Sequence, residues 1–352
     1  MRYIGNKSNL LDFIYKPIEE RDICNGIFCD IFSGTANVAK FFKNKGFQII
    51  SNDFMTCSYV FQKAYIENNK IPKFSGLSGI IEKPNISKVI QFLNDSKGRE
   101  GFIFKNFTLE GTKKSMSKYK RNYFSHENGK KIDAIRDKIE EWKNEGKINE
   151  IEFYVLLCTL LEKVPSISNI AGTYGAFLKI NDQRMFKPLL LNVLNLIESN
   201  IKHYCYKESA NQLVRKISPD VLYIDPPYNT RQYASNYHIL ESIAVWDKKI
   251  RDNKTGLRNY NEQKSDYCYL NKCASAFEDL IMNAKCKHII FSYNTEGIIP
   301  YNEIIRILSL RGEPIEYRQR YRRYKSNGNG IKNHKGNELE ELLFYVRTEN
   351  NS

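Results

Sequence analysis

The stretch Asp225-Pro226-Pro227-Tyr228 holds the residues best suited to chemistry in this sequence. It follows Val221–Ile224, an apolar run that predicts a buried strand. Open α/β sheets bind their ligands at the carboxyl ends of strands. Two consecutive prolines donate no backbone hydrogen bonds and hold the loop extended, so the neighbouring carbonyl groups remain able to accept from a ligand.

A carboxylate beside such a carbonyl suits the activation of a planar amine such as that of adenine, whose lone pair is delocalised into the ring. If Asp225 accepts one N–H and the Pro226 carbonyl accepts the other, the nitrogen moves towards tetrahedral geometry and can attack an electrophilic methyl group. Tyr228 offers a ring on which the base can stack. Taken alone, the motif also suits a rigid turn with a capping Asp, but its place after a strand favours a ligand site.

A second motif, Asp30–Ala36, joins a predicted strand at Ile27–Phe32 to an amphipathic stretch that begins at Val38. Small residues at such a turn let a ligand approach backbone amides closely. Asp53 follows the next predicted strand, where a carboxylate can accept from both hydroxyls of a ribose. The pair is compatible with any nucleotide-binding fold, although the absence of a GxGxxG fingerprint counts against NAD and FAD.

The N-terminal stretch Arg2-Tyr3-Ile4-Gly5-Asn6-Lys7 reads by itself as an ordinary basic terminus. A lysine close to a glycine can, however, pair with the carboxylate of a methionine moiety. In the order Lys7, Phe32–Ala36 and Asp225–Tyr228, the three motifs resemble those of the alpha-group adenine-specific DNA methyltransferases, which include the Dam methylase and the FokI-type modification methylases. Asp225–Tyr233 and Gly172–Lys179 are similar to the FokI-type branch in particular. The resemblance covers most of the chain except about 70–150.

This resemblance implies S-adenosylmethionine (SAM) as the cofactor and a flipped adenine as the acceptor. It implies that Asp225, Pro226 and Tyr228 hold the adenine and that Phe291–Asn294 line its pocket. The implied cofactor-binding residues are Tyr3, Lys7, Phe32, Ser33, Gly34, Asp53 and Asp225. No metal ligand is expected.

Two positions depart from the family pattern. Ala36 replaces the second glycine of the cofactor loop, which costs little if this residue is helical. The acidic residue that usually meets the cofactor's adenine could be Glu208, but the register is ambiguous between Glu208 and Ser209.

The formal net charge of +14, from 54 Lys and Arg against 40 Asp and Glu, favours a polyanionic partner. Double-stranded DNA is the partner that the resemblance implies. Residues 113–131 form one basic region and 317–335 another, although charge runs are more often simply solvated surface. The residues predicted to contact DNA are Arg318, Arg320, Arg322, Arg323 and Lys325.

The predicted elements alternate between strands and helices, which favours an α/β fold with helices on both faces of the sheet. Together with the resemblance, this predicts a Rossmann-like methyltransferase sheet with an antiparallel C-terminal hairpin. Residues 1–69 and 189–352 would form the catalytic domain, and 70–188 an inserted target-recognition region. Helices are predicted near Lys131–Lys147, Glu152–Lys163, Leu189–Ile201, Tyr237–Trp246 and Ala274–Asn283.

The predicted function is site-specific methylation of adenine in DNA, as the modification enzyme of a bacterial restriction–modification system. FokI-type relatives often act on sites that contain ATG, such as CATG or GGATG. Methylation of cytosine or RNA and a non-catalytic DNA-binding role are the alternatives. No run of residues is apolar enough for a membrane span. We therefore expect a cytoplasmic monomer that does not bind membranes and that can have a cognate endonuclease.

Overall fold

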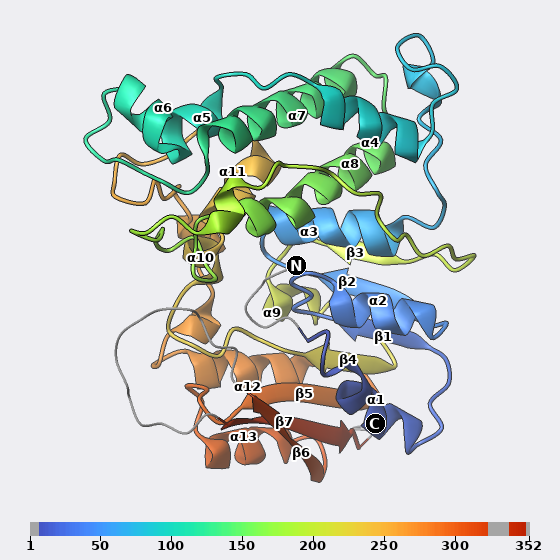
Figure 1. The fold of residues 1–352 in the computed structure, drawn as a ribbon. Coiled ribbons are helices and arrows are strands. Elements are labelled where there is room, and N and C mark those ends of the chain that lie inside the picture. Colours follow the sequence, from blue (N-terminus) through green and yellow to red (C-terminus); the bar gives the residue numbers. More distant parts are fainter. Residues whose placement is uncertain (1–6, 323–337, 350–352) are drawn as a thin grey trace. The chain divides into compact units, whose positions relative to one another are not determined.

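The computed structural model describes residues 7–322 and 338–349 of the chain, which divide into two compact units (Figure 1). The described part of the sheet unit comprises 7–62, 200–233, 261–322 and 338–349, and the helical unit comprises Lys63–Ser199 and Ala234–Tyr260. The sequence analysis bounded the insert at 70–188. The helical unit is longer than that at both ends, and it also takes in a segment from beyond the Asp225–Tyr228 motif.

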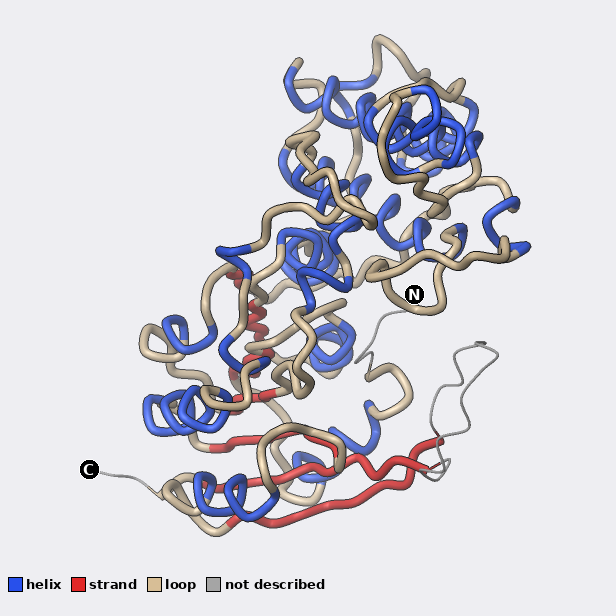
Figure 2. The backbone as a smooth tube through the Cα atoms, turned by 90° about the vertical axis from the view of Figure 1, so that its left-hand side faces the viewer, coloured by secondary structure: helices blue, strands red, loops and turns tan. Residues whose placement is uncertain are grey.

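The sheet unit is built on seven strands in the order β3-β2-β1-β4-β5-β7-β6 (red in Figure 2). The strands from β3 to β5 pair in parallel, and β7 runs antiparallel to both β5 and β6. The predicted α/β class and the antiparallel final pair are confirmed. Their bounds are β1 Ile27–Asp30, β2 Gln48–Asn52, β3 Tyr204–Tyr206, β4 Val221–Ile224, β5 His288–Asn294, β6 Pro314–Arg322 and β7 Glu338–Arg347.

Alternating side chains of these strands enter two apolar layers, one on each face of the sheet. Phe28 stacks on Phe42 of α2 at 3.7 Å between ring centroids, whereas its neighbour Cys29 belongs to the core on the other face, with Phe277 of α12 and Ile304 of α13. Burial on both faces explains why β4 reads as an unbroken apolar run. The helices of this unit are α1 Leu11–Glu19, α2 Asn37–Asn44, α3 Thr56–Gln62, α9 Ala210–Leu213, α12 Cys273–Asn283 and α13 Tyr301–Leu308.

The helical unit is held together by buried polar contacts between segments distant in sequence. The Arg136 guanidinium donates to the Ile243 carbonyl at 2.8 Å, and the Trp246 indole donates to Asp137 at 2.8 Å. These bonds tie α11 to α7, which is why 234–260 belongs to this unit. Its helices are α4 Ile86–Asp95, α5 Phe102–Phe107, α6 Leu109–Lys114, α7 His126–Asn144, α8 Glu150–Lys163 and α11 His238–Val245, and α10 Tyr233–Asn236 spans the boundary.

The remaining helical elements are short. Lys63–Glu67 is a π-helical turn, and five 3₁₀ turns lie at Ser75–Leu77, Val164–Ile167, Gln183–Phe186, Asn261–Gln263 and Asp266–Cys268. In the part of the chain that the structure describes, none of the helices has the length and apolar character to cross a membrane.

The helix predicted at Leu189–Ile201 is wrong, because this segment has no regular secondary structure. Side chains of the helical unit take up the backbone groups that a helix would pair internally. The Asn128 carboxamide accepts from Leu189 N, and the Asn94 carboxamide both accepts from Leu191 N and donates to Leu191 O. Tertiary hydrogen bonds therefore outweigh the helix-forming tendency of a leucine-rich run.

Candidate active site

Asp225 lies one residue beyond β4, at the carboxyl edge of the sheet, where the sequence analysis expects a ligand site. Its side chain is 12% exposed, and its Oδ1 atom is buried without a hydrogen-bond partner among the described residues. Burial raises the pKa of Asp225 to about 6, against the opposing effect of the Lys7 ammonium. A buried carboxylate has oxygen lone pairs that can accept an incoming N–H group.

Lys7 is the cation of this site and lies between two carboxylates. Its Nζ is 3.4 Å from Asp225 Oδ1 and 3.3 Å from Glu341 Oε2. The Lys7 side chain is 4% exposed, and although burial opposes the charged form, the two carboxylates and Tyr228 raise its pKa above the ordinary value. Lys7 is therefore charged at neutral pH, and it favours the ionised form of Asp225.

Glu341 was not among the predicted site residues. This residue lies on β7 directly opposite Asn294, the last residue of β5. The only signal in the sequence was an acidic residue immediately before an apolar strand. The strand register is needed to bring that residue to the site, and register between distant strands cannot be read from one sequence.

Aromatic side chains form a wall beside the acidic group. The Tyr228 ring packs edge-on against Tyr293 with centroids 5.9 Å apart, and Lys7 Nζ lies 5.6 Å from the Tyr228 centroid. Asn294 is buried at the end of β5. The structure thus brings Tyr228, Tyr293 and Asn294 to the same strand ends as Asp225, which supports the predicted base pocket as a proposal.

The predicted cofactor loop is ordered by Asp53. Asp53 Oδ2 accepts from Gly34 N and Oδ1 accepts from Met55 N, each at 2.9 Å. Ser33 is held from both sides, by a bond from its backbone N to Asn52 O and by one from Ser51 Oγ to Ser33 Oγ. The loop and the Asp53 carboxylate are therefore preorganised next to each other, as a site for a nucleoside requires.

Asp30, at the end of β1, is a second buried acid at this edge. Its Oδ1 atom is buried without a hydrogen bond within the described ranges. Burial, and after it the neighbouring charge of Asp225, raise the pKa of Asp30 to about 8. The buried Asp30 Oδ1 atom, the Asp225 carboxylate and the Gly34 loop together fit a bound polar ligand such as SAM.

Ala36 does not have the helical conformation on which the sequence analysis relied. It has φ 59° and ψ 22°, in the left-handed region, and it forms the N-cap of α2. This region is where glycine is favoured and where an alanine is strained.

The two candidates for the contact with the cofactor's adenine, Glu208 and Ser209, lie between β3 and α9. Glu208 pairs with Lys216, and its backbone N donates to the Asn52 side chain. The Ser209 carbonyl accepts from Gln212 and Leu213 at the start of α9.

Four of the remaining predicted contacts fall where the structure gives no side-chain description. Tyr3, Arg323 and Lys325 lie outside the described residues, and the Arg322 side chain is likewise not described. Arg320 is exposed. Arg318 pairs with Glu316 and with Glu340, the latter at 3.2 Å, so much of its charge is compensated within the hairpin.

The parallel sheet with its antiparallel hairpin, the acidic motif after β4 and the ordered loop after β1 define the chain as a methyltransferase. It belongs to the D12 class of N6 adenine-specific DNA methyltransferases, whose sequence profile matches residues 3–304.

Curated relatives agree with this assignment. The chain is 44% identical to the type II methyltransferase M.FokI of Planomicrobium okeanokoites and 39% identical to the modification methylase StsI of Streptococcus sanguinis, over 99% of this chain but 52% of each relative. It is 39% identical to the type II methyltransferase M.NlaIII of Neisseria lactamica over 98% of this chain and 99% of that one. The chain thus spans about half the length of M.FokI and StsI and nearly all of M.NlaIII.

Proposed function

We propose that this protein is the modification enzyme of a restriction–modification system and transfers a methyl group from SAM to the exocyclic amine of a flipped adenine in duplex DNA. The observation that carries the proposal is the Asp225 carboxylate, which is buried at the carboxyl edge of a methyltransferase sheet with the Lys7 ammonium 3.4 Å from its Oδ1 atom. Family membership and M.NlaIII, which matches along nearly its whole length, support it.

In this proposal, the amine donates one N–H to Asp225 and the other to the Pro226 carbonyl, while Tyr228 stacks on the base. These contacts turn the nitrogen lone pair away from the ring and towards the methyl group. SAM supplies a methyl group on a positively charged sulfur, which leaves as a neutral thioether. As the N–C bond forms, the nitrogen loses the proton that it donated to Asp225, and this carboxylate is placed to take that proton.

Cofactor binding is assigned in this proposal to the loop residues Phe32, Ser33 and Gly34, to Asp53 and Lys7, and to the carboxylate of Asp225. The Gly34 backbone N donates to Asp53 Oδ2 at 2.9 Å, so a substitution at either residue should disturb the same pocket. Lys7 keeps Asp225 ionised and can pair with the cofactor's carboxylate. The enzyme would act as a monomer in the bacterial cytoplasm, alongside an endonuclease of the same specificity.

The decisive experiment measures transfer of labelled methyl from SAM to unmethylated duplex DNA by the wild type and by Asp225→Ala. Hydrolysis to nucleosides identifies the methylated base, and sequencing of the product maps the site. We expect N6-methyladenine at one short sequence, with CATG and GGATG the first candidates, and no transfer by the variant. Label on cytosine or only on RNA would redirect the proposal to those substrates. Tight DNA binding without any transfer would indicate a non-catalytic role.

A further inference from the structure

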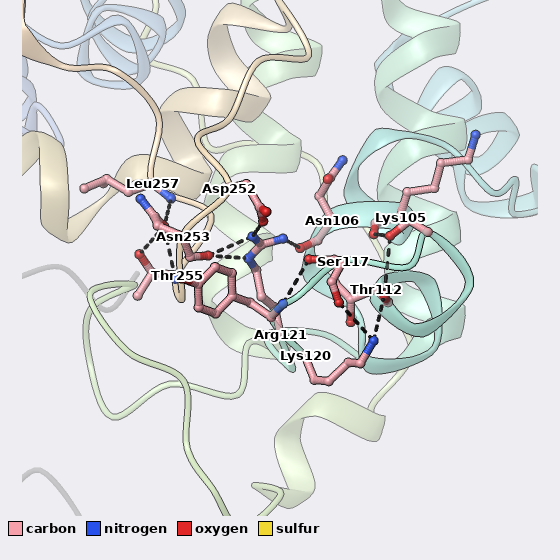
Figure 3. A network of polar contacts seen from close by, with 12 residues as sticks. Lys105, Asn106, Thr112, Ser117, Lys120, Arg121, Asp252, Asn253, Thr255 and Leu257 are labelled. Atoms are coloured by element: carbon pink, nitrogen blue, oxygen red, sulfur yellow. Dashed lines mark hydrogen bonds and ion pairs between the residues drawn. The ribbon is translucent and has the colours of Figure 1, made fainter.

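Arg121 is a charged side chain buried in the helical unit, where it joins two loops that are distant in sequence (Figure 3). We call residues 115–122 loop A and residues 247–257 loop B. The Arg121 side chain is 1% exposed. Its Nε and Nη2 donate to Asn253 O at 3.1 and 2.7 Å, and its Nη1 donates to Asn106 O at 3.3 Å. The guanidinium of loop A therefore fixes the position of loop B.

Loop B is ordered internally as well as by this clamp. The Asn253 carboxamide accepts from Thr255 N at 3.2 Å and from Leu257 N at 3.0 Å. Gly256 has φ +68°, and a Cβ there would lie 2.8 Å from Phe107 Cε1 and 3.1 Å from Arg121 Nε. The close approach explains why glycine occupies this position. The backbone of loop B is therefore well ordered, and the positions of its side chains are defined by it.

The carboxylates of loop B are bound by other cations. Asp252 is paired with Arg121 at 3.2 Å, and Asp247 is paired with Arg258 at 3.0 Å. Their negative charge is thus compensated within the unit.

Five exposed cations of the two loops have no such partner. Among the residues that the structure describes, no carboxylate pairs with the side chains of Lys118, Lys120, Lys249, Arg251 and Lys254. Lys120 Nζ instead donates to the Ser117 carbonyl at 3.0 Å, which orders loop A, and Arg251 donates to the Asn259 side chain at 2.7 Å. These five side chains differ from Arg318, whose charge is compensated by two glutamates. Exposed cations without carboxylate partners, carried by two loops that Arg121 joins, are suited to a polyanion.

We propose that loops A and B together form a surface that binds the phosphate backbone of duplex DNA. Arg121 is the positioning residue, because its hydrogen bonds fix loop B next to loop A. The proposal rests on the proposed function for the identity of the polyanion. It adds loop B, which follows the catalytic motif in sequence and which the sequence analysis placed in the catalytic domain. Lys and Arg contacts to phosphate release condensed counterions, so this surface should control how steeply DNA affinity depends on salt.

The test is the Kd of the full-length protein for a fluorescent duplex, measured by anisotropy across a series of salt concentrations. Arg251→Ala/Lys254→Ala removes two cations of loop B, and Lys118→Ala/Lys120→Ala removes two of loop A. Each lost phosphate contact lowers the slope of log Kd against log salt by about 0.9. We therefore expect each double variant to lower the slope by about 1 to 2 and to weaken binding roughly tenfold at physiological salt.

The matched control is Lys202→Ala/Lys285→Ala. Both lysines are exposed, and they precede β3 and β5, so they lie at the amino ends of parallel strands, away from the Asp225 edge of the sheet. The control should keep the wild-type slope. A wild-type slope in both loop variants, or an equal loss in the control, would overturn the proposal. Greater weakening for an RNA hairpin than for duplex DNA would overturn the choice of DNA.

Arg121→Gln tests the link between the two loops, because it removes a buried charge that cannot contact phosphate directly. We expect this variant to bind DNA more weakly while it keeps a cooperative thermal unfolding transition. If it fails to fold, the double variants of the two loops decide the proposal. Methyl transfer at saturating DNA separates the two hypotheses. If the wild type methylates DNA and the loop variants bind DNA as tightly as the wild type, only this inference is refuted. If the wild type binds DNA through these loops but transfers no methyl group, only the proposed function is refuted.

Discussion

Asp225 has the burial and the raised pKa of a group that acts near neutral pH, and its charge depends on several neighbours. Lys7 favours the ionised form, while burial and the charge of Glu341 favour the protonated form. Asp30 and Tyr223 are further titratable groups whose pKa values are coupled to Asp225. The net result is a pKa of about 6, which is above the ordinary value of an aspartate.

The first prediction concerns pH. Asp225 can accept an N–H of the amine only when ionised, so activity should be lost as the pH falls through the raised pKa. We expect kcat/KM for methyl transfer to be constant above about pH 6 and to fall tenfold per unit below it. Asp225→Asn has no charge to titrate. It should lose at least about a thousandfold in activity, and its remaining activity should not fall at low pH in this way. An acid limb near pH 4 in the wild type would contradict the raised pKa.

Glu341→Gln provides the second prediction. Glutamine keeps the size of the side chain but removes the negative charge that raises the pKa of Asp225. The acid limb of kcat/KM should therefore move to lower pH. Lys7 would also be drawn more strongly to Asp225 and compete with the amine, so activity at neutral pH should fall roughly tenfold, the equivalent of one charge-assisted hydrogen bond.

Glu340→Gln is the control for this measurement, because Glu340 is next to Glu341 on β7 but pairs with Arg318. It should leave the pH profile unchanged. An identical profile for both variants would show that Glu341 does not act on Asp225.

Among the elements, the turn between β1 and α2 shows how far the sequence predicts the site. The small residues there and the acid after β2 led to the predicted cofactor loop and to Asp53. The structure joins the two by the bond from Gly34 N to Asp53 Oδ2, because parallel strands end at one edge, and cofactor binding by these residues stays a prediction. The left-handed conformation of Ala36 was missed, because one replacement of glycine by alanine does not reveal the backbone angle. Similarly, β4 could be predicted from its apolar run, whereas β3, with three partly exposed residues, offered no pattern.

The third prediction follows from that turn. Ala36→Gly should relieve the strain of a left-handed alanine, which amounts to roughly 1–2 kcal/mol and is partly offset by the greater freedom of glycine in the unfolded chain. We expect a rise in thermal unfolding temperature of about 2 °C. The control is Ala39→Gly, two residues into α2, which should lower that temperature because glycine is unfavourable within a helix. A lower unfolding temperature in Ala36→Gly would contradict the assigned conformation.

At the level of the whole molecule, the chain passes between the two units after Gln62, Ser199, Tyr233 and Tyr260. A change in composition along the sequence led to the predicted insert at 70–188, which falls within the first segment of the helical unit, Lys63–Ser199. The return of 234–260 could not be predicted, because the sequence of α11 indicates a helix but not the unit to which it belongs. Its place depends on tertiary bonds such as that from Arg136 to Ile243. The proposed chemistry lies in the sheet unit, which leaves the helical unit as the proposed source of sequence specificity.

The last prediction tests this division of labour by exchange of segments with a relative of different mapped specificity. M.NlaIII, which aligns with 98% of this chain, is a suitable donor if its site differs. Replacing both Lys63–Ser199 and Ala234–Tyr260 should transfer the donor's methylation site and leave the Kd for SAM unchanged, because the cofactor loop and Asp53 stay in place. Replacing the first segment alone should give a poorly active enzyme, since Arg121 would then lose its matched loop B. Methylation by the double exchange at the original site would show that specificity resides in the sheet unit, and an altered Kd for SAM would show that the two functions are not separable.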